Sequence, residues 1–268
     1  MTDNCKNDDE QASLPFAETK PSDGATTTAT HQPIGETGQR KPRVLLALTG
    51  SVAAIKGPEL AVRIAEEHNA AVKILLTRGG QHFWDKAEVY NPLYWKKLQD
   101  MMMFHGEMDT SHISIHDADD EWKGWQKLGD AVLHIELRDW ADILVVAPLS
   151  AHTMAKIAMG LCDDTLTCVI RAWDFGHGSR PGKPLLLAPA MNTAMWNHPL
   201  TKSQLQTIQG FWNASRPVSS PNVDPNSTEN GIQIIAPEVK VLACGETGDG
   251  ALASVTEIVR VVGRFISS

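Results

Sequence analysis

The sequence predicts an α/β protein of three layers, in which helices cover both faces of a parallel β-sheet. The first observation is that short apolar runs alternate with longer segments of helical periodicity. The second is that these runs are mostly apolar, with little of the polar alternation of half-exposed strands, as expected for strands buried on both faces. The third is composition: hydrophobic residues make up 42% and charged residues 21% of the 268 residues, which is typical of a globular domain.

The first 42 residues differ from the rest of the chain. Met1, Leu14, Phe16 and Ile34 are their only large apolar residues, and 26–30 holds only threonine and alanine. Such a segment buries too little apolar surface to offset the conformational entropy lost on folding. We therefore expect a disordered tail over 1–42 and a single folded domain over 43–268.

Five strands and their connections are expected in order from residue 43. The first strand covers 43–49, and a helix follows over 52–67 after a break at Gly50 and Ser51. The other strands are expected at 71–77, 142–148, 183–189 and 231–236, and the other helices at 150–160, 201–208 and 256–266. The segment 78–133 is less regular. The segment 211–230 is rich in serine, proline and asparagine, which predicts a loop insertion.

Charge and hydropathy exclude several classes of function. The formal net charge of −8 argues against a nucleic-acid binder, which would carry a basic surface. It leaves phosphorylated small ligands open, because a local pocket can oppose the global charge. There is no apolar run of about 18 residues and no basic-then-apolar signal pattern at the N-terminus. We expect a cytoplasmic protein without a nucleic-acid or membrane partner.

Cysteine spacing and glycine motifs narrow the chemistry further. The four cysteines lack zinc-type spacing, so we expect reduced thiols and no metal. Cys162 and Cys168 fit buried positions in a helix or strand. The chain contains neither G-x-G-x-x-G nor G-x-x-x-x-G-K-[ST], which disfavours dinucleotide and nucleoside triphosphate binding.

Small and polar residues follow four of the expected strands, at 49–52, 77–80, 147–150 and 188–192. In an open parallel sheet, ligands bind beyond the carboxyl ends of the strands. A small residue and a hydroxyl at a helix start can offer N–H groups and an Oγ to an anion. Ser51 and Ser150 fit this description, but both also fit ordinary helix N-caps.

Five sequence blocks, in order, resemble one known family. They are TGSVAAIK at 49–56, HIELRDWAD at 134–142, APLSA at 147–151, PAMNTAMW at 189–196 and ACGETGDGA at 243–251. From about 43 to 266 the chain resembles the eukaryotic phosphopantothenoylcysteine decarboxylases, of the homo-oligomeric flavin-containing cysteine decarboxylase family. The resemblance implies a Rossmann-like, flavodoxin-like sheet. It also implies an FMN enzyme that decarboxylates 4′-phosphopantothenoylcysteine in coenzyme A biosynthesis, as a homotrimer with sites between subunits.

The resemblance also assigns catalytic and substrate residues. His134, the first residue of its block, would accept the substrate's thiol proton, and Cys244, in a glycine-rich loop, would return a proton to the decarboxylated product. Asn192 would bind the substrate carboxylate. Met191, Ala243 and Gly245 would also contact the substrate. Without the resemblance, His134 fits a structural histidine and Asn192 an ordinary turn residue.

FMN is assigned by the same resemblance to the ends of the first four expected strands. Hydroxyls and backbone N–H groups there would hold the phosphate and ribityl chain, and apolar side chains would cover the ring. The assigned residues are Gly50, Ser51, Val52, Thr77, Phe83, Ser150, Ala151, Thr153 and Ala190.

Four positions depart from the family pattern. His152 and Asp164 stand where asparagine is usual, Asp139 replaces an arginine, and Leu252 replaces a methionine. An alternative function is a non-catalytic flavoprotein of the same fold that regulates, as an inhibitor, a Ser/Thr protein phosphatase. Because His134, Asn192 and Cys244 are all present, the enzyme is favoured.

Overall fold

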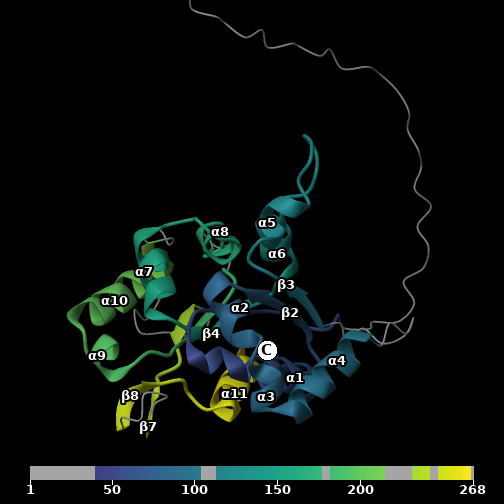
Figure 1. Cartoon of the computed structure of the whole chain (residues 1–268). Helices are drawn as coiled ribbons and strands as arrows, with labels where there is room; N and C mark the ends of the chain where they lie inside the picture. The colour runs from purple at the N-terminus through teal and green to yellow at the C-terminus, as the bar shows by residue number, and fades with distance from the viewer. Residues whose placement is uncertain (1–39, 104–112, 177–181, 215–230, 242–246, 267–268) are drawn as a thin grey trace, which may run out of the picture. The chain divides into compact units, whose positions relative to one another are not determined.

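The computed structural model describes residues 40–103, 113–176, 182–214, 231–241 and 247–266 (Figure 1). Contacts divide the chain after residue 39, near the boundary expected at 42. The expected tail lies almost wholly outside the described residues. The following account concerns the unit that begins at Arg40.

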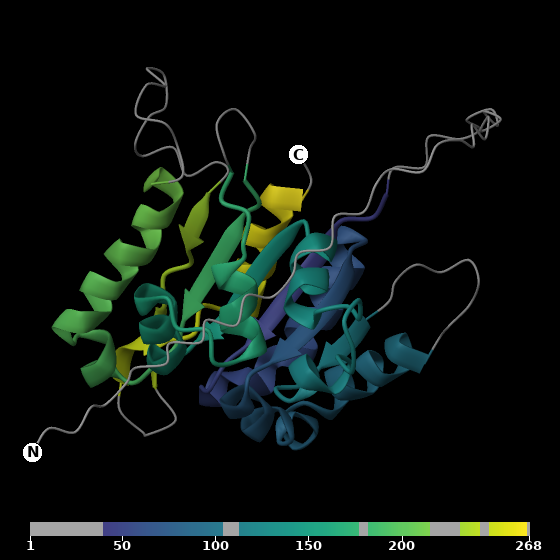
Figure 2. The ribbon, with the colours of Figure 1, turned by 90° about the horizontal axis from the view of Figure 1, so that it is seen from above.

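A six-stranded sheet forms the centre of this unit, and every pair of neighbouring strands is parallel. The expected α/β fold is therefore confirmed. Figure 2 shows the strands side by side, in the order β3-β2-β1-β4-β5-β6. The strands are β1 (Arg43–Leu48), β2 (Ala71–Leu76), β3 (Ile113–His116), β4 (Ile143–Leu149), β5 (Leu185–Pro189) and β6 (Ile232–Ile234).

Strand β3 corrects the expected number of strands. The five expected strands have the spatial order 2-1-3-4-5 of flavodoxin-like sheets, and β3 adds an edge strand that produces the 3-2-1-4-5-6 order. Its four residues form a run too short to be separated from a loop by pattern alone. The segment 78–133 is also more regular than expected. It holds α2 (Arg78–Trp84), α3 (Ala87–Tyr90), α4 (Pro92–Met103) and α5 (Asp120–Lys123).

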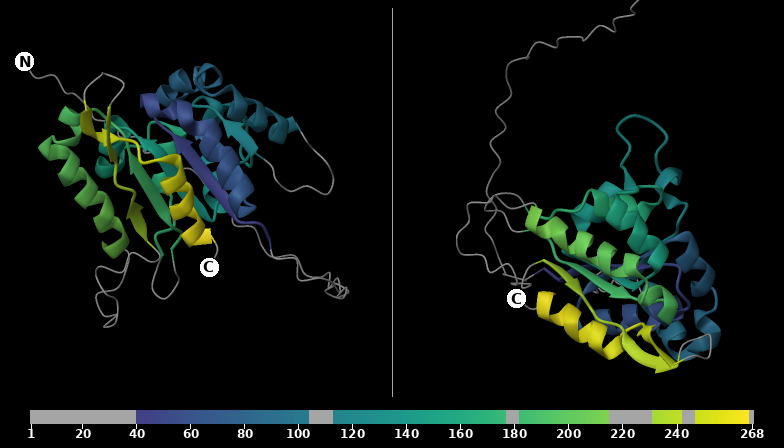
Figure 3. Two further views of the ribbon diagram at one scale, coloured as in Figure 1. Left: turned by 90° about the horizontal axis from the view of Figure 1, so that it is seen from below. Right: turned by 90° about the vertical axis from the view of Figure 1, so that its left-hand side faces the viewer.

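Helices cover both faces of the sheet. Successive residues of each strand point to opposite faces, and the strands carry apolar side chains on both of them. In β1, Val44, Leu46 and Leu48 pack on one side, with α1 (Gly57–His68), α4 and α11 (Val255–Ile266). Leu45 and Ala47 pack on the other side. That side is covered by α6 (Leu133–Trp140), α7 (Ala151–Met159), α8 (Thr165–Arg171) and α10 (Pro199–Ala214). Figure 3 shows α10 and α11 on opposite sides of the sheet.

Several expected boundaries shift. The helix expected over 52–67 begins as a 3-10 helix, η1 (Val52–Lys56), before α1. Residues 211–214 belong to α10 rather than to the expected insertion, whose remainder at 215–230 lies outside the described residues. A short helix, α9 (Thr193–Trp196), follows β5, and β7 (Glu238–Val241) pairs antiparallel with β8 (Thr247–Ala251).

Two cysteines are less buried than expected. Cys162 is exposed between α7 and α8, and Cys168 is only partly buried on α8. Within the described part of the chain, no helix has the length and apolar character needed to cross a bilayer.

Candidate cofactor and substrate site

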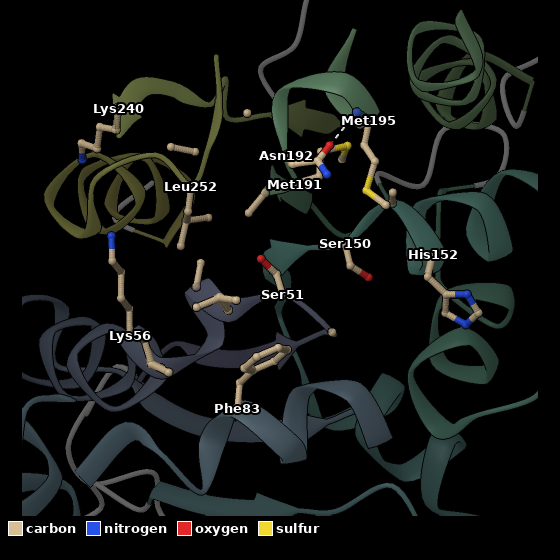
Figure 4. A pocket seen from close by; sticks show the side chains of 18 of the residues that line it. Ser51, Lys56, Phe83, Ser150, His152, Met191, Asn192, Met195, Lys240 and Leu252 are labelled. Atoms are coloured by element: carbon tan, nitrogen blue, oxygen red, sulfur yellow. Dashed lines mark hydrogen bonds between the residues drawn. The ribbon is translucent and has the colours of Figure 1, made fainter. Parts of the chain in front are cut away.

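The carboxyl ends of β1, β4 and β5 open into a cavity of about 620 Å³. The chain adds β2 and β3 on one side of β1. It then crosses back and adds β4, β5 and β6 on the other side of β1. Connections therefore leave β1 and β4 in opposite directions, which leaves a crevice between their ends. Figure 4 shows the side chains that line it, drawn from the turns after three strands, from η1 and α2, and from the β7–β8 hairpin.

The start of α2, directly after β2, requires glycine because its backbone packs against the end of β1 and the turn that follows it. A Cβ atom on Gly79 would lie 2.8 Å from Cα of Gly50, and one on Gly80 would lie 2.1 Å from the carbonyl oxygen of Leu48. Ser51 precedes η1 but makes no side-chain cap hydrogen bond. Its hydroxyl points into the cavity (Figure 4) and is available to a ligand. Ser51 thus occupies the N-cap position of η1, but its hydroxyl does not cap that helix.

Ser150, by contrast, does act as an N-cap. Its Oγ accepts a hydrogen bond from the backbone N–H of Thr153 at 3.3 Å, at the start of α7. Thr77 plays the same part at α2, where its Oγ1 accepts a hydrogen bond from Gly80 N at 3.2 Å. Thr77 and Thr153 are buried and do not line the cavity. They support the turns that do.

Thr49 joins the turns after β1 and β4. Its buried hydroxyl donates to the carbonyl oxygen of Pro148 at 2.8 Å and accepts from the backbone N–H of Ser150 at 2.7 Å. Both strand ends are thereby held at one spacing beneath the cavity. The resemblance gave no role to Thr49, although its position at the end of an apolar run was a signal.

The turn after β5 places Ala190, Met191 and Asn192 on the cavity wall. Asn192 Oδ1 accepts a hydrogen bond from Met195 N at 2.8 Å and so caps α9. Because the oxygen is used in the cap, the Nδ2 amide group remains as a donor at the cavity (Figure 4). Met191 N donates to Gly250 O at 2.9 Å, which attaches the β7–β8 hairpin to this turn.

Two lysines that the sequence assignment missed also line the cavity, Lys56 from η1 and Lys240 from β7. Figure 4 shows both side chains on the same side of it. Burial, followed by the positive charge of Lys240, lowers the pKa of Lys56, while Glu59 and Glu238 oppose the shift. Lys240 forms an ion pair with Glu238. Lys56 ends the TGSVAAIK block, which was a usable signal, whereas nothing in the sequence pointed to Lys240.

Most of the cofactor residues expected from the sequence meet at this cavity. They are Gly50, Ser51, Val52, Phe83, Ser150, Ala151 and Ala190. Tyr90, Met195 and Leu252 are further lining residues that were not assigned to a ligand.

His134 does not line the cavity of its own chain. It is the second residue of α6, and its Nδ1 lies 2.5 Å from Oε1 of Glu121 on α5. Ala243, Cys244 and Gly245 lie outside the described residues. They belong to the connection between β7 and β8, and residues on both of these strands line the cavity.

The four departures from the family pattern have different surroundings. His152 and Leu252 line the cavity. Asp164 caps α8 through Thr167 N and forms an ion pair with Lys156 at 2.9 Å. Asp139 pairs with its neighbour Arg138 at 2.6 Å on the surface. Asp164 thus has a structural role that a carboxylate performs as well as an amide.

A doubly wound sheet with a polar and apolar cavity at its switch point is typical of proteins that bind a nucleotide-like cofactor. A family model described as Flavoprotein matches residues 34–267. The chain therefore belongs to the flavoprotein family.

Within this family, the chain is similar to phosphopantothenoylcysteine decarboxylases. The rice (Oryza sativa subsp. japonica) protein of that name is 44% identical over 213 residues, which are 80% of this chain and 76% of the relative. A cysteine-to-serine mutant of a PPC decarboxylase, complexed with pantothenoylaminoethenethiol, is 41% identical with a TM-score of 0.63, over 85% of this chain and 100% of that one. The FMN binding protein AtHal3 is 42% identical with a TM-score of 0.58, over 83% and 95%.

Proposed function

We propose that this protein is a phosphopantothenoylcysteine decarboxylase, which uses FMN to convert 4′-phosphopantothenoylcysteine into 4′-phosphopantetheine in coenzyme A biosynthesis. The observation that carries the proposal is the cavity at the ends of β1, β4 and β5, found in a chain 44% identical to such a decarboxylase. A cytoplasmic location belongs to the same proposal, because the exposed Cys162 thiol suits a reducing compartment.

The cavity residues fit a flavin. The close approach of Gly50 and Gly79 leaves no room for a side chain at Gly79, and Gly50 places side-chain-free backbone on the cavity wall. Ser51 adds a hydroxyl without a cap bond, while Phe83 and Ala190 add apolar surface. When bound, FMN would supply a two-electron acceptor that later returns the electrons.

Asn192 and the two lysines of the cavity would hold the two anionic ends of the substrate, the carboxylate and the phosphate. The Nδ2 amide group of Asn192 would donate to the carboxylate, because its Oδ1 is already used by Met195 N. Lys56 and Lys240 would hold the phosphate through their ammonium groups. The negative global charge is no obstacle, since these two cations act locally.

Two further groups would move protons in the proposed reaction. His134 would accept the proton of the substrate's thiol, and Cys244 would donate one to the carbon chain after carbon dioxide has left. Because His134 does not line the cavity of its own chain, we propose a homotrimer in which it serves the cavity of a neighbouring subunit.

The direct test is anaerobic turnover of 4′-phosphopantothenoylcysteine by the purified, FMN-loaded chain. We expect 4′-phosphopantetheine, detected by mass. The His134→Asn variant should keep at most a small fraction of this activity. Flavin-loaded protein that makes no product would overturn the decarboxylase and leave the non-catalytic flavoprotein as the alternative.

Complementation tests the shared site. His134→Asn and Asn192→Asp each remove one partner of the proposed reaction. If sites combine residues of two subunits, co-expressed variants carrying different tags form mixed oligomers in which some sites contain both native residues. We expect activity in the mixed oligomer and little in either parent. A mixed oligomer as inactive as its parents would contradict the shared site.

A further inference from the structure

Glu121 is a buried carboxylate that has no role among the residues assigned to the proposed decarboxylation. Its side chain is only 4% exposed, although its neighbour Trp122 on α5 is 77% exposed. Burying a carboxylate is costly unless it is paired and hydrogen-bonded. Among the described residues, its ion-pair partner is His134.

The contact between these residues is a single short hydrogen bond. Oε1 of Glu121 lies 2.5 Å from Nδ1 of His134, and Oε2 is buried without a hydrogen-bond partner. An ionised carboxylate only accepts hydrogen bonds. The Nδ1 position of His134 must therefore carry the proton, and when the ring is neutral its lone pair lies on Nε2.

The surroundings of Glu121 hold it in this position. On the outer side of α5, Lys123 forms ion pairs with Asp120 at 2.8 Å and Asp117 at 3.0 Å. The backbone N–H of Asp117 also donates to Asp120 Oδ2 at 2.8 Å. These bonds hold the short helix α5 in place. Glu121, on the inner side of α5, is thereby kept against His134 on α6.

The neighbouring thiol adds no second charge at neutral pH. Burial, and next the charge of Glu121, raises the pKa of Cys168 on α8 to about 11. Cys168 is therefore a neutral thiol beside the carboxylate, and its Sγ donates to the carbonyl oxygen of Cys162 at 3.5 Å. The neutral Cys168 thiol therefore leaves His134 as the partner of Glu121.

The other edge of the histidine ring is open. The His134 side chain is 24% exposed, and within the described part of the chain no hydrogen bond engages its Nε2. One ring edge is thus anchored by a buried carboxylate while the other faces outward with a lone pair. This arrangement orients a general base toward a group outside its own subunit core.

We propose that Glu121 is a positioning residue that holds His134 as the Nδ1–H tautomer, with Nε2 presented as the proton acceptor. The inference rests on the proposed decarboxylation for its role in turnover, but its geometric part concerns only this chain. It adds Glu121 to the residues that the reaction requires, although Glu121 does not line the cavity of its own chain.

The test combines histidine ¹⁵N NMR with kinetics on the FMN-loaded protein. The spectrum reports which ring nitrogen carries the proton, and the His134 signals are assigned by their loss in His134→Asn. We expect the Nδ1–H tautomer in the native chain at a pH where the ring is neutral. An Nε2–H tautomer there overturns the inference without any further variant.

Glu121→Gln keeps the shape of the side chain but adds an amide group that can donate to Nδ1. We expect a mixture of both tautomers and a fall in kcat of about 10–100-fold, with unchanged flavin content and KM. Glu136→Gln is the matched control, because Glu136 is exposed on the same helix as His134 and makes the same change of charge. It should keep the native tautomer and kcat.

The proposal requires that Glu121→Gln change both the tautomer and kcat. A variant that changes only one of the two overturns it. The two proposals fail in different ways. A native protein without turnover overturns the decarboxylase, while its NMR spectrum still decides the geometry of Glu121 and His134. An active native protein whose Glu121→Gln variant is equally active overturns only the positioning role.

Discussion

Thr49 Oγ1 accepts a hydrogen bond from the backbone N–H of Ser150 at 2.7 Å, across 101 positions of sequence. The same hydroxyl donates to Pro148 O at 2.8 Å. A fully buried threonine thus connects the two strand ends between which the cavity opens. Its side chain couples the stability of the sheet to the shape of the proposed flavin site.

Thr49→Val removes this hydroxyl while keeping the size of the side chain. Ser150 N–H then loses its buried partner, so we expect the free energy of unfolding to fall by about 1–3 kcal/mol. Urea denaturation measures it. Thr207→Val is the control, because the Thr207 hydroxyl is exposed and donates to Ser203 O within α10. Equal stability of the two variants would show that the Thr49 bonds contribute little.

Asn192→Asp separates the cap from the proposed substrate contact. Aspartate caps a helix about as well as asparagine, so folding and flavin content should be unchanged. The variant lacks the Nδ2 donor and brings a negative charge toward the substrate carboxylate. We expect kcat/KM to fall by about 100-fold or more, measured by product mass. Asn197→Asp, an exposed change at the other end of α9, should keep its activity. Native-like turnover in Asn192→Asp would exclude Asn192 as a carboxylate ligand.

Gly250→Ala should move the hairpin that borders the cavity. The added Cβ would lie 2.2 Å from Met191 O, so the β7–β8 hairpin must shift away from the turn that carries Asn192. We expect about a tenfold to hundredfold loss of kcat/KM. Gly210→Ala is the control, because nothing lies within 4 Å of a Cβ at that exposed position in α10. It should stabilise the protein by about 0.5–1 kcal/mol. Unchanged kinetics in Gly250→Ala would show that the hairpin contact does not shape the site.

Substrate affinity should depend on pH through Lys56. Because burial and Lys240 lower the pKa of Lys56, its ammonium group loses its charge at a lower pH than an ordinary lysine does. The charged form binds the phosphate, so KM should rise as the pH increases toward about 10. Lys56→Arg remains charged there and should show a smaller rise. Pantothenoylcysteine without the phosphate is the control substrate. An equal rise in KM for both substrates would contradict a phosphate contact at Lys56.

Local patterns were sufficient to predict most of the sheet. Mostly apolar runs located β1, β2, β4, β5 and β6, because strands covered by helices on both faces carry few polar residues. The four-residue β3 lacks such a run and was missed. The small and hydroxyl-bearing residues after the strands also indicated the cavity, since parallel strands bring their carboxyl ends to one edge. Ser51 and Asn192 were found in this way and through the family blocks.

The sequence by itself determined the fold class, about half of the residues at the cavity and the resemblance to flavin-dependent decarboxylases. Each of these depends on short segments whose periodicity or order can be read directly. Only the tertiary structure decided which side chains meet. It paired Thr49 with Ser150, Glu121 with His134, and Lys56 with Lys240 beside one cavity, while it left His134 away from that cavity. These contacts depend on the order of the strands and on the turn of each helix about its axis. Residue spacing along the chain does not contain that information.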